Sequence, residues 1–298
     1  MSQLRGITVL EVERKRRNAL ANFFVRLVRE KRLGVVGGVI VLILLFCGIF
    51  ADVLAPYGMN EISLEDRFAP RSAKYLVGTD QLGRDILSRI IYGARVSLIV
   101  GLAGTVVNIV VASIIGVPSG YFGGKYDIIV QRFVDAWMAF PGLLILLTVM
   151  SLVGRGTLQI ILVLGILFGI GSSRIVRSAV IGVKENDYFL AAEAIGSTNA
   201  RTLIWHIVPN IMAPMIIIFS ISIGEIILSE AGLSFLGYGL PPDVPSWGGM
   251  LSHEGRMFME IKPELALFPG IALATVVYGV NMFGDALRDL LDPRLRGG

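Results

Sequence analysis

Four polar side chains in otherwise apolar stretches are the first candidates for chemistry in this sequence. They are one amide and three carboxylates: Asn108, Asp135, Glu225 and Glu230. Ionisable groups at membrane depth are costly, and they usually face a bundle interior or a wet cavity. These residues are therefore predicted to line a path for a polar solute. The alternative is a structural ion pair, or a place near a helix end for Asp135 and Glu230.

Catalytic and metal chemistry find little support in the sequence. The two histidines, His206 and His253, fall on opposite sides of the membrane in the topology argued below, so they cannot share a metal. His253 lies among Glu254 and several methionines, which would suit a soft metal, but an ordinary exposed loop is the alternative. Cys47, the single cysteine, lies in an apolar run and is interpreted as a buried thiol. No Walker A motif occurs. The chain is predicted to be no enzyme, with no catalytic, cofactor or metal residue.

A polar segment at 184–206 carries paired helix signals. Asp187 is a good N-cap residue, and Tyr188 and Ala191 begin one face of the helix that would follow it. Gly196 can adopt the positive φ that ends a helix, and a second helix is predicted to start at 197 or 198. Small residues such as Ala192 leave one face thin enough to enter a groove of another protein. A helix resting on the membrane surface is the alternative.

The elements that must hold these residues are membrane-spanning helices. Hydrophobic residues make up 54% of the 298 positions and charged residues 17%, too few for the surface of a soluble domain of this length. Spanning the hydrocarbon core takes about 20 helical residues. Six apolar runs approach or reach this length, and they are Leu33–Ala51, Val96–Val117, Ala136–Val153, Thr157–Ser173, Ile207–Gly224 and Leu265–Phe283. The predicted fold class is therefore an all-α integral membrane protein with six transmembrane helices.

Basic residues set the orientation of these helices. About two thirds of the 27 Lys and Arg residues fall in residues 1–32, in the second and fourth connections, and at the C-terminus. The positive-inside rule then places both termini in the cytoplasm. Nucleic-acid binding by the basic N-terminal segment is the competing interpretation, but juxtamembrane bases orient helices far more often. The chain is therefore predicted to contact membrane lipid and no nucleic acid.

The predicted organisation has four parts. Residues 1–32 form a cytoplasmic basic segment, and 33–94 hold the first span and a large outer segment. Residues 95–290 form a five-helix core, with the inner loop 184–206 and an outer loop at 232–262, and 291–298 form a cytoplasmic tail. Three local expectations accompany this division: an interfacial helix over 80–95 that runs into the second span, a Gly-rich inner turn over 118–124, and a third helix that contains Pro141.

The inner segment resembles a known motif. Ala191-Ala192, Gly196 and Pro209 match the spacing of the EAA loop of ATP-binding cassette (ABC) importer membrane subunits, E-A-A-x3-G-x9-I-x-L-P. The sequence departs from the pattern in three places, with Leu190 for Glu, His206 for Ile and Val208 for Leu. The resemblance implies that Asp187, Tyr188, Leu190, Ala191, Ala192, Glu193, Gly196 and Pro209 belong to a coupling loop that enters a groove of an ATPase subunit.

Three further stretches resemble the second permease subunit of dipeptide, oligopeptide and nickel importers. They are Leu76–Leu98, which begins Leu-Val-Gly-Thr-Asp-Gln-Leu-Gly-Arg-Asp, the Gly- and Pro-rich stretch Gly232–Gly248, and the tail Asn281–Arg294. The resemblance implies a type I ABC importer permease in the cytoplasmic membrane of a bacterium or archaeon. Its partners would be a homologous permease chain in a heterodimer, two cytoplasmic ATPases that bind ATP and Mg²⁺, and an extracytoplasmic solute-binding protein.

The solute is predicted to be a short peptide. A bare-metal path should present several His, Cys or carboxylate ligands at membrane depth, and the six runs offer few. Nickel, glutathione-like compounds and sugar-linked solutes are the alternatives within the same architecture. A stand-alone channel or secondary transporter, and a membrane scaffold without transport, are the alternatives from other classes.

Overall fold

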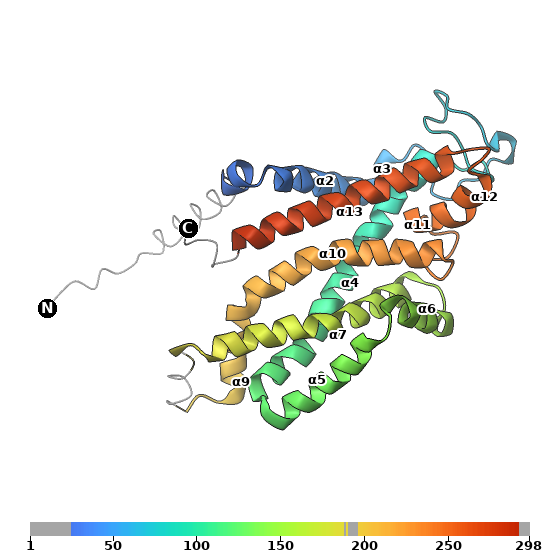
Figure 1. The fold of residues 1–298 in the computed structure, drawn as a ribbon. Coiled ribbons are helices and arrows are strands. Elements are labelled where there is room, and N and C mark those ends of the chain that lie inside the picture. Colours follow the sequence, from blue (N-terminus) through green and yellow to red (C-terminus); the bar gives the residue numbers. More distant parts are fainter. Residues whose placement is uncertain (1–24, 188, 190–195, 292–298) are drawn as a thin grey trace.

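The computed structural model of the chain describes residues 25–187, 189 and 196–291, and within them regular structure is helical. An isolated bridge between Thr79 and Asp85 is the exception. Figure 1 shows the long helices running side by side in an elongated bundle. The longer helices are α2 (Arg32–Ile49), α4 (Ile86–Phe122), α5 (Gly124–Ala139), α6 (Gly142–Val153), α7 (Thr157–Lys184), α10 (Met212–Phe235) and α13 (Glu264–Leu291). The short α-helices are α3 (Ala51–Leu54), α9 (Asn199–Thr202), α11 (Trp247–Gly249) and α12 (Arg256–Phe258). Two short 3-10 turns lie at Leu64–Asp66 and Val208–Ile211. Two π-helical stretches lie at Leu203–Ile207 and Met250–Gly255.

Among the described residues, five helices are long and apolar enough to cross a membrane. They are α2, α4, α7, α13 and the stretch Asn199–Phe235, which includes α10. Helices α5 and α6 pass the same test only together, and they are bent by 88° at the break between them. The predicted all-α membrane fold is confirmed, and it has six spans when this bent pair counts as one.

The two ends of the bundle differ in what they carry. Residues 55–85, α11 and α12 gather at one end, and α9 and the last turn of α7 lie at the other (Figure 1). We call these the outer and inner ends, after the topology that the basic residues predict.

The second span begins earlier than its apolar run. Helix α4 starts at Ile86, where the Asp85 carboxylate accepts a hydrogen bond from the Ser88 N–H at 2.8 Å and caps the first turn. The predicted helix over 80–95, which was expected to run into the second span, is found only over 86–95, where it forms the first part of α4. Residues 80–85 form a turn instead, because the Asp80 carboxylate accepts the backbone N–H groups of Leu82 and Arg84 at 2.8 and 2.9 Å.

The predicted Gly-rich turn over 118–124 is also wrong for most of its length. Helix α4 continues through Pro118 to Phe122, and the chain reverses at Gly123 and Gly124, which have φ values of +63° and +55°. Glycine adopts such positive φ without the steric cost that other residues meet. The turn therefore needs only two residues.

The third predicted helix is broken at Pro141. Phe140 is extended, with φ −84° and ψ 140°, and Pro141 precedes the first turn of α6. A residue before proline is driven out of the helical region by a clash with the proline ring. A continuous helix over 136–153 is therefore wrong, and α5 instead begins at Gly124.

Close helix contacts depend on glycine. Helix α4 packs along α7, and a Cβ built on Gly116 would lie 2.4 Å from the Ser173 carbonyl oxygen. A Cβ on Gly169 of α7 would lie 2.6 Å from Val111 Cβ. Small residues let helix backbones approach closely, which is how helices associate in lipid. Helix α13 packs on α2 and α10, and its inner end is tied to α2 by the Lys31–Asp289 ion pair at 2.5 Å.

Candidate functional site

The inner connection between α7 and α9 has the ends that the sequence predicts. Asp187 is helical and exposed, and Gly196 has φ +76°, which places it in the left-handed region. Thr198 precedes α9 as its N-cap residue, one of the two predicted starts of the second helix. Tyr188, Leu190, Ala191, Ala192 and Glu193 lie outside the described residues. The predicted coupling role of the loop stays a prediction.

Three contacts fix this connection to the membrane helices. The Phe189 side chain is 4% exposed and packs in an apolar cluster with Val180 of α7 and Ile207. Lys184 Nζ donates to the Tyr121 carbonyl oxygen at 2.6 Å, and the Tyr121 hydroxyl donates to Asn199 Oδ1 at 2.8 Å. A displacement of this loop would therefore be transmitted to the inner ends of both α4 and α7.

Pro209 lies where the chain changes helix type before α10. The five residues before Val208 are π-helical, and the Val208 N–H donates to the Leu203 carbonyl oxygen. Proline has no N–H to continue the ladder, so the preceding turn must adjust. Asn210 Nδ2 donates to the His206 carbonyl oxygen at 2.6 Å beside this proline.

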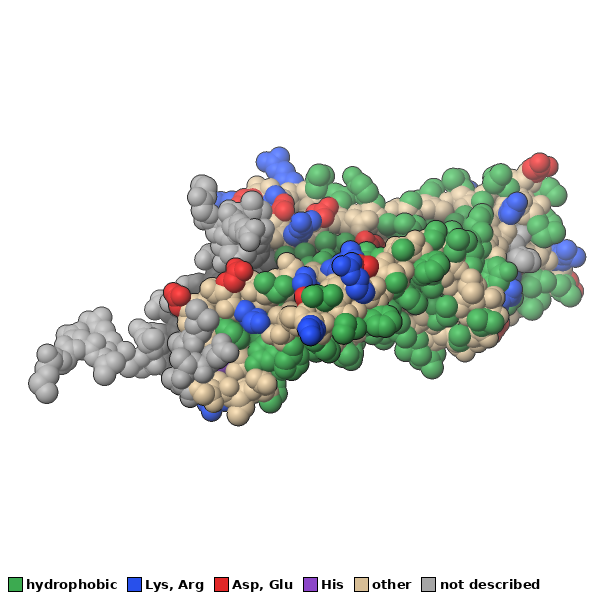
Figure 2. Space-filling view, turned by 60° about the horizontal axis from the view of Figure 1, so that its bottom comes forward, with side chains coloured by type: hydrophobic (Ala, Val, Ile, Leu, Met, Phe, Trp, Pro, Cys, Tyr) green, Lys and Arg blue, Asp and Glu red, His purple; other side chains and the backbone are tan. Residues whose placement is uncertain are grey.

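Asp135 of α5 lies in a charged hollow between α5 and α7. Its carboxylate accepts from the Arg174 guanidinium, and Arg132 Nη1 lies 3.5 Å away. The same hollow holds Arg177, which donates two hydrogen bonds to the Asp127 carboxylate. Its volume is about 450 Å³. Figure 2 turns the α5 side forward and shows acidic and basic side chains together on a surface that is elsewhere largely hydrophobic.

Glu225 of α10 lines a second hollow, to which α7 and α13 also contribute. This hollow has a volume of about 430 Å³ and includes Ser172 of α7, Ser222 of α10 and Arg288 of α13. The Glu225 side chain is exposed in the single chain. A carboxylate, a guanidinium and two hydroxyls therefore surround a space bounded otherwise by Ile, Ala and Pro side chains.

The other two predicted path residues lie inside the packed chain. Asn108 is fully buried, and its Nδ2 donates to Ser222 Oγ at 2.8 Å across the α4–α10 contact. Glu230 is 1% exposed and accepts from Ser234 Oγ at 2.7 Å. The structure therefore separates the four residues: Asp135 and Glu225 face hollows, while Asn108 joins α4 to α10 and Glu230 is enclosed by the packed chain.

Several residues of this site were not found by sequence reasoning. Arg174 and Arg177 were used only as inner-side positive charges, although each pairs with a carboxylate on α5. Their spacing of three residues places both guanidinium groups on one helix face and indicates a shared acidic partner surface. Phe189 carried no signal of its own, because contacts remote in sequence give it its place. Among the described residues, no group of three or more His, Cys, Asp or Glu is arranged to hold a metal ion.

The class that this arrangement defines is a multi-pass helical membrane protein with charged hollows between its long helices. Residues 109–297 match the family described as binding-protein-dependent transport system inner membrane component. Residues 22–70 match the N-terminal transmembrane domain of oligopeptide transport permease C. The chain belongs to the binding-protein-dependent inner membrane permease family.

Similar proteins cover nearly the whole chain. The dipeptide transport system permease protein of Alkalihalophilus pseudofirmus is 36% identical over 268 residues, which is 90% of this chain and 88% of that protein. The oligopeptide transport system permease protein of Bacillus subtilis is 36% identical over 268 residues, with the same coverage of 90% and 88%. The glutathione transport system permease protein of Pectobacterium atrosepticum is 36% identical over 276 residues, 92% of this chain and 91% of that protein.

Family membership decides several sequence-based predictions. The chain is a permease subunit of an ABC importer, a multi-pass protein of the inner membrane and a non-catalytic component of its system. The family depends on a binding protein and implies an ATPase partner. A stand-alone channel, a secondary transporter and a scaffold without transport are therefore set aside.

Proposed function

We propose that this chain forms half of the translocation pathway of an importer for di- and oligopeptides. Its partner in the membrane is a homologous permease chain, so that the pathway is a heterodimer. Two cytoplasmic ATPase subunits bind ATP and Mg²⁺, and this chain binds neither. An extracytoplasmic solute-binding protein delivers the peptide to the outer end.

The observation that carries this proposal is the pair of charged hollows along the spanning helices. Arg174 lies ten residues before the inner end of α7, about 15 Å along the helix axis, and it pairs with Asp135. Glu225 lies ten residues before the outer end of α10, again about 15 Å along the axis. Exposing Glu225 to lipid would cost about 2.5–3.5 kcal/mol, the scale for a charged residue near the bilayer centre. A partner chain or a water-filled path is therefore needed beside the Glu225 hollow, while the Asp135 hollow lies toward the inner side.

The chemistry of these hollows suits a peptide. A peptide carries an amine, a carboxylate and amide groups, and the Glu225 hollow offers one carboxylate, one guanidinium and two hydroxyls. Side chains of the solute would remain largely unrecognised in so sparse a lining. The names of the relatives support this choice, because they refer to dipeptide, oligopeptide and glutathione transport, and glutathione is itself a tripeptide.

The coupling loop would link ATP to the pathway. The segment that includes Asp187, Leu190, Ala191, Ala192 and Glu193 enters a groove of one ATPase subunit, by resemblance to the EAA loop. Phe189, Lys184 and Asn199 tie its ends to α4 and α7. Closure of the ATPase pair would then move these inner helix ends and open the pathway outward. ATP can drive this change only if it binds the two states with different affinity.

Uptake by the reconstituted complex tests the proposal. Liposomes with both permeases, both ATPases and the binding protein should take up a mixed dipeptide pool in the presence of ATP. Glu225→Gln should slow peptide uptake several-fold, because it removes a charge that faces the pathway. Asp285→Asn, which removes an exposed charge outside the described hollows, is the matched control. Uptake of nickel without any peptide uptake would contradict the peptide assignment.

A further inference from the structure

A basic segment precedes α2 at the inner end, away from the two hollows just described. Residues 25–30 are helical, the helix is interrupted at Lys31, where φ is −129° and ψ is 65°, and α2 then begins at Arg32. The basic residues of this segment are Arg26, Arg29, Lys31 and Arg32. The positive-inside rule places them at the cytoplasmic surface of the membrane.

One side of the segment packs on α13. Leu27 is buried in an apolar cluster with Ala286 and Leu290 of α13, and Lys31 Nζ lies 2.5 Å from the Asp289 carboxylate. Figure 1 shows the start of α2 beside the end of α13. The other side of the segment therefore faces away from α13.

The exposed side of the segment combines bases with apolar side chains. Arg29 and Arg32 are exposed, and so are their neighbours Val28 and Leu33. Further along α2, the exposed residues are apolar, and they include Val36, Val39, Leu42 and Phe46. One continuous face of the chain thus changes from basic to apolar where α2 enters the membrane, as expected for a surface in contact with a lipid headgroup and its acyl chains.

The charges next to this face are paired within the fold. Arg26 Nε lies 3.1 Å from the Glu30 carboxylate, and Lys31 is paired with Asp289. In the part of the chain that the structure describes, no hydrogen bond or ion pair joins the side chain of Arg29 or Arg32 to another residue. Their two guanidinium groups therefore leave a net positive charge at the membrane surface.

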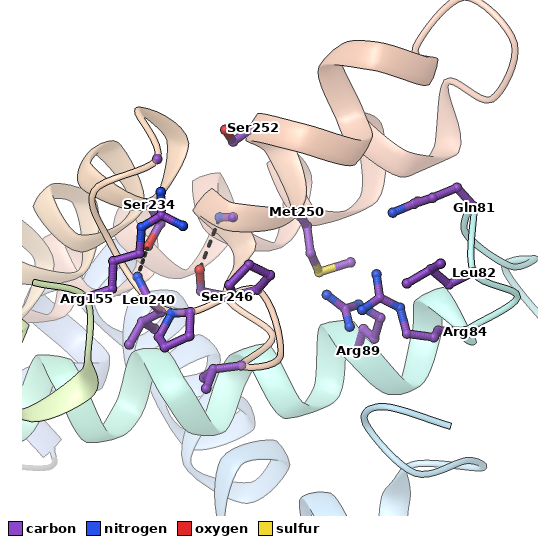
Figure 3. A pocket seen from close by; sticks show the side chains of 15 residues that line it. Gln81, Leu82, Arg84, Arg89, Arg155, Ser234, Leu240, Ser246, Met250 and Ser252 are labelled. Carbon is purple, nitrogen blue, oxygen red and sulfur yellow. Dashed lines mark hydrogen bonds between the residues drawn. The ribbon is translucent and has the colours of Figure 1, made fainter. Parts of the chain in front are cut away.

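Arginines in the cavity at the outer end are placed differently. Figure 3 shows Arg84 and Arg89 side by side in the wall of this cavity. Both are buried, and Arg84 Nε donates to the Asp80 carboxylate at 2.6 Å. Those side chains hold the outer segment together, whereas Arg29 and Arg32 extend from the fold.

We propose that Arg29 and Arg32 bind the phosphate of an anionic phospholipid in the cytoplasmic leaflet. A planar guanidinium holds a phosphate group through two parallel hydrogen bonds. Juxtamembrane bases are also attracted by the negative potential of the cytoplasmic leaflet. The acyl chains of the bound lipid lie along Val36 and Val39, so a soluble phosphate would lack half of the contacts. This site does not depend on which solute the transporter carries.

A fluorophore on α2 reports the lipids that lie beside it. Bimane attached to Val36→Cys, in a Cys47→Ser background, is read in the assembled transporter in nanodiscs of phosphatidylglycerol and phosphatidylcholine. Bromine on the acyl chains of one lipid at a time quenches the fluorophore according to the occupancy of that lipid. Phosphatidylglycerol should be preferred about tenfold at this position, because the two bases favour its charge.

Charge removal tests the residues that carry the preference. Arg29→Gln/Arg32→Gln should bring the affinities of the two lipids to within about twofold, while Arg29→Lys/Arg32→Lys should retain part of the preference. Lys125→Gln/Arg201→Gln is the matched control, because it removes two exposed bases from the same end of the bundle, and it should keep the tenfold preference. Unchanged quenching by phosphatidylcholine verifies that each variant is folded.

Three results would overturn the site. Equal loss of preference in the control pair would mean that the general charge of the inner surface attracts the lipid. No quenching by either lipid would mean that protein covers this face of α2. Loss of phosphatidylglycerol quenching on addition of millimolar glycerol phosphate would identify a site for a soluble phosphate instead of a lipid.

Discussion

Single carboxylates shape the outer segment between α3 and α4. Asp66 accepts hydrogen bonds from Lys74 Nζ, the Ser63 hydroxyl and the Tyr75 hydroxyl at 2.8, 2.8 and 2.9 Å. Asp80 closes the turn before α4, and Asp85 caps the helix itself. Each of these carboxylates accepts hydrogen bonds from backbone or side-chain groups that would otherwise bond to water. A loop without regular structure therefore keeps one shape.

Acid should weaken the outer segment through Asp66. Hydrogen bonds from Lys74, Ser63 and Tyr75 lower the pKa of the Asp66 carboxyl to about 2. An unfolded Asp has a pKa of about 3.9, so the stabilisation is fully present above about pH 4 and is lost as the pH falls toward 2. Asp66→Asn should therefore make the segment 57–85 more sensitive to pepsin than the unmodified protein at pH 4, with the difference disappearing at pH 2.

Glu65→Gln is the control for this experiment, because Glu65 is the neighbouring carboxyl and is exposed. It should leave the pepsin cleavage rate unchanged at both pH values. A constant difference between Asp66→Asn and the unmodified protein from pH 4 to pH 2 would show that the ionised carboxylate is not what stabilises the segment.

Gly196 should be essential to coupling because of its backbone, not because of lack of space. Its φ is +76°, and a Cβ built on it would meet nothing within 4 Å. A left-handed conformation costs an ordinary residue about 1–2 kcal/mol, and a β-branched residue more. Gly196→Val should abolish ATP-dependent uptake while the protein still inserts. Gly196→Asn should retain most uptake, since Asn tolerates this region, and equal activity of the two variants would refute the argument.

At the scale of elements, hydrophobic periodicity located the helices but not their breaks. Five of the six predicted spans are found as long helices, and the third corresponds to the bent pair α5–α6. About 20 consecutive apolar residues have few alternatives to a membrane helix. The effects of Pro118 and Pro141 on the helices are the reverse of those predicted. Pro118 was assigned to a turn and lies within α4, whereas Pro141 was assigned to a helix and breaks it. Tertiary packing decides such cases: α4 is held against α7 beside Pro118 by Gly116 and Gly120.

The contact between α4 and α7 should tolerate no added atom at Gly116. A Cβ there would lie 2.4 Å from the Ser173 carbonyl oxygen and 2.9 Å from Val176 Cβ. Overpacking of this kind costs about 1–3 kcal/mol. Gly116→Ala should therefore lower the midpoint of thermal unfolding of the purified protein in detergent, measured by loss of the monodisperse peak on heating.

Gly182→Ala is the matched control, because a Cβ at Gly182 on α7 would meet nothing within 4 Å. Within an unobstructed helix this substitution stabilises by up to about 1 kcal/mol, so its midpoint should stay level or rise. Equal loss of stability in both variants would mean that backbone contact between α4 and α7 is not the cause.

At the scale of the whole molecule, the sequence predicted the kinds of site residues better than their partners. Asp135 and Glu225 were identified as carboxylates in apolar runs, and both face hollows. Their neighbours Arg174 and Arg288 could not be assigned to them, because pairing depends on how α5, α7, α10 and α13 pack. Asn108 and Glu230 have the same local signature, yet the packed chain encloses them. A polar side chain within a span indicates that it has a polar partner, but the sequence does not indicate which residue that partner is.

Alternate connections of the chain lie at opposite ends of the bundle, as expected when each span crosses the membrane once. The segment 55–85 and the connection after α10 lie together at one end, joined by the hydrogen bond from Lys262 Nζ to the Ala69 carbonyl oxygen at 3.2 Å. The connection after α7 lies at the other end (Figure 1). The arrangement depends on the bent pair α5–α6 returning the chain across the membrane, because five spans alone would place the two outer segments on opposite sides.

Cysteine labelling tests this topology. In a Cys47→Ser background, Ser72→Cys and Asp243→Cys should react with an impermeant maleimide in intact cells, because both positions are exposed at the outer end. Glu185→Cys, exposed at the end of α7, should react only after the membrane is opened, because positive-inside orientation keeps that end in the cytoplasm. Equal labelling of all three after lysis controls for accessibility. If positions 72 and 243 labelled from opposite sides, α5 and α6 would form a re-entrant pair, and both the sixth span and the common outer end would be lost.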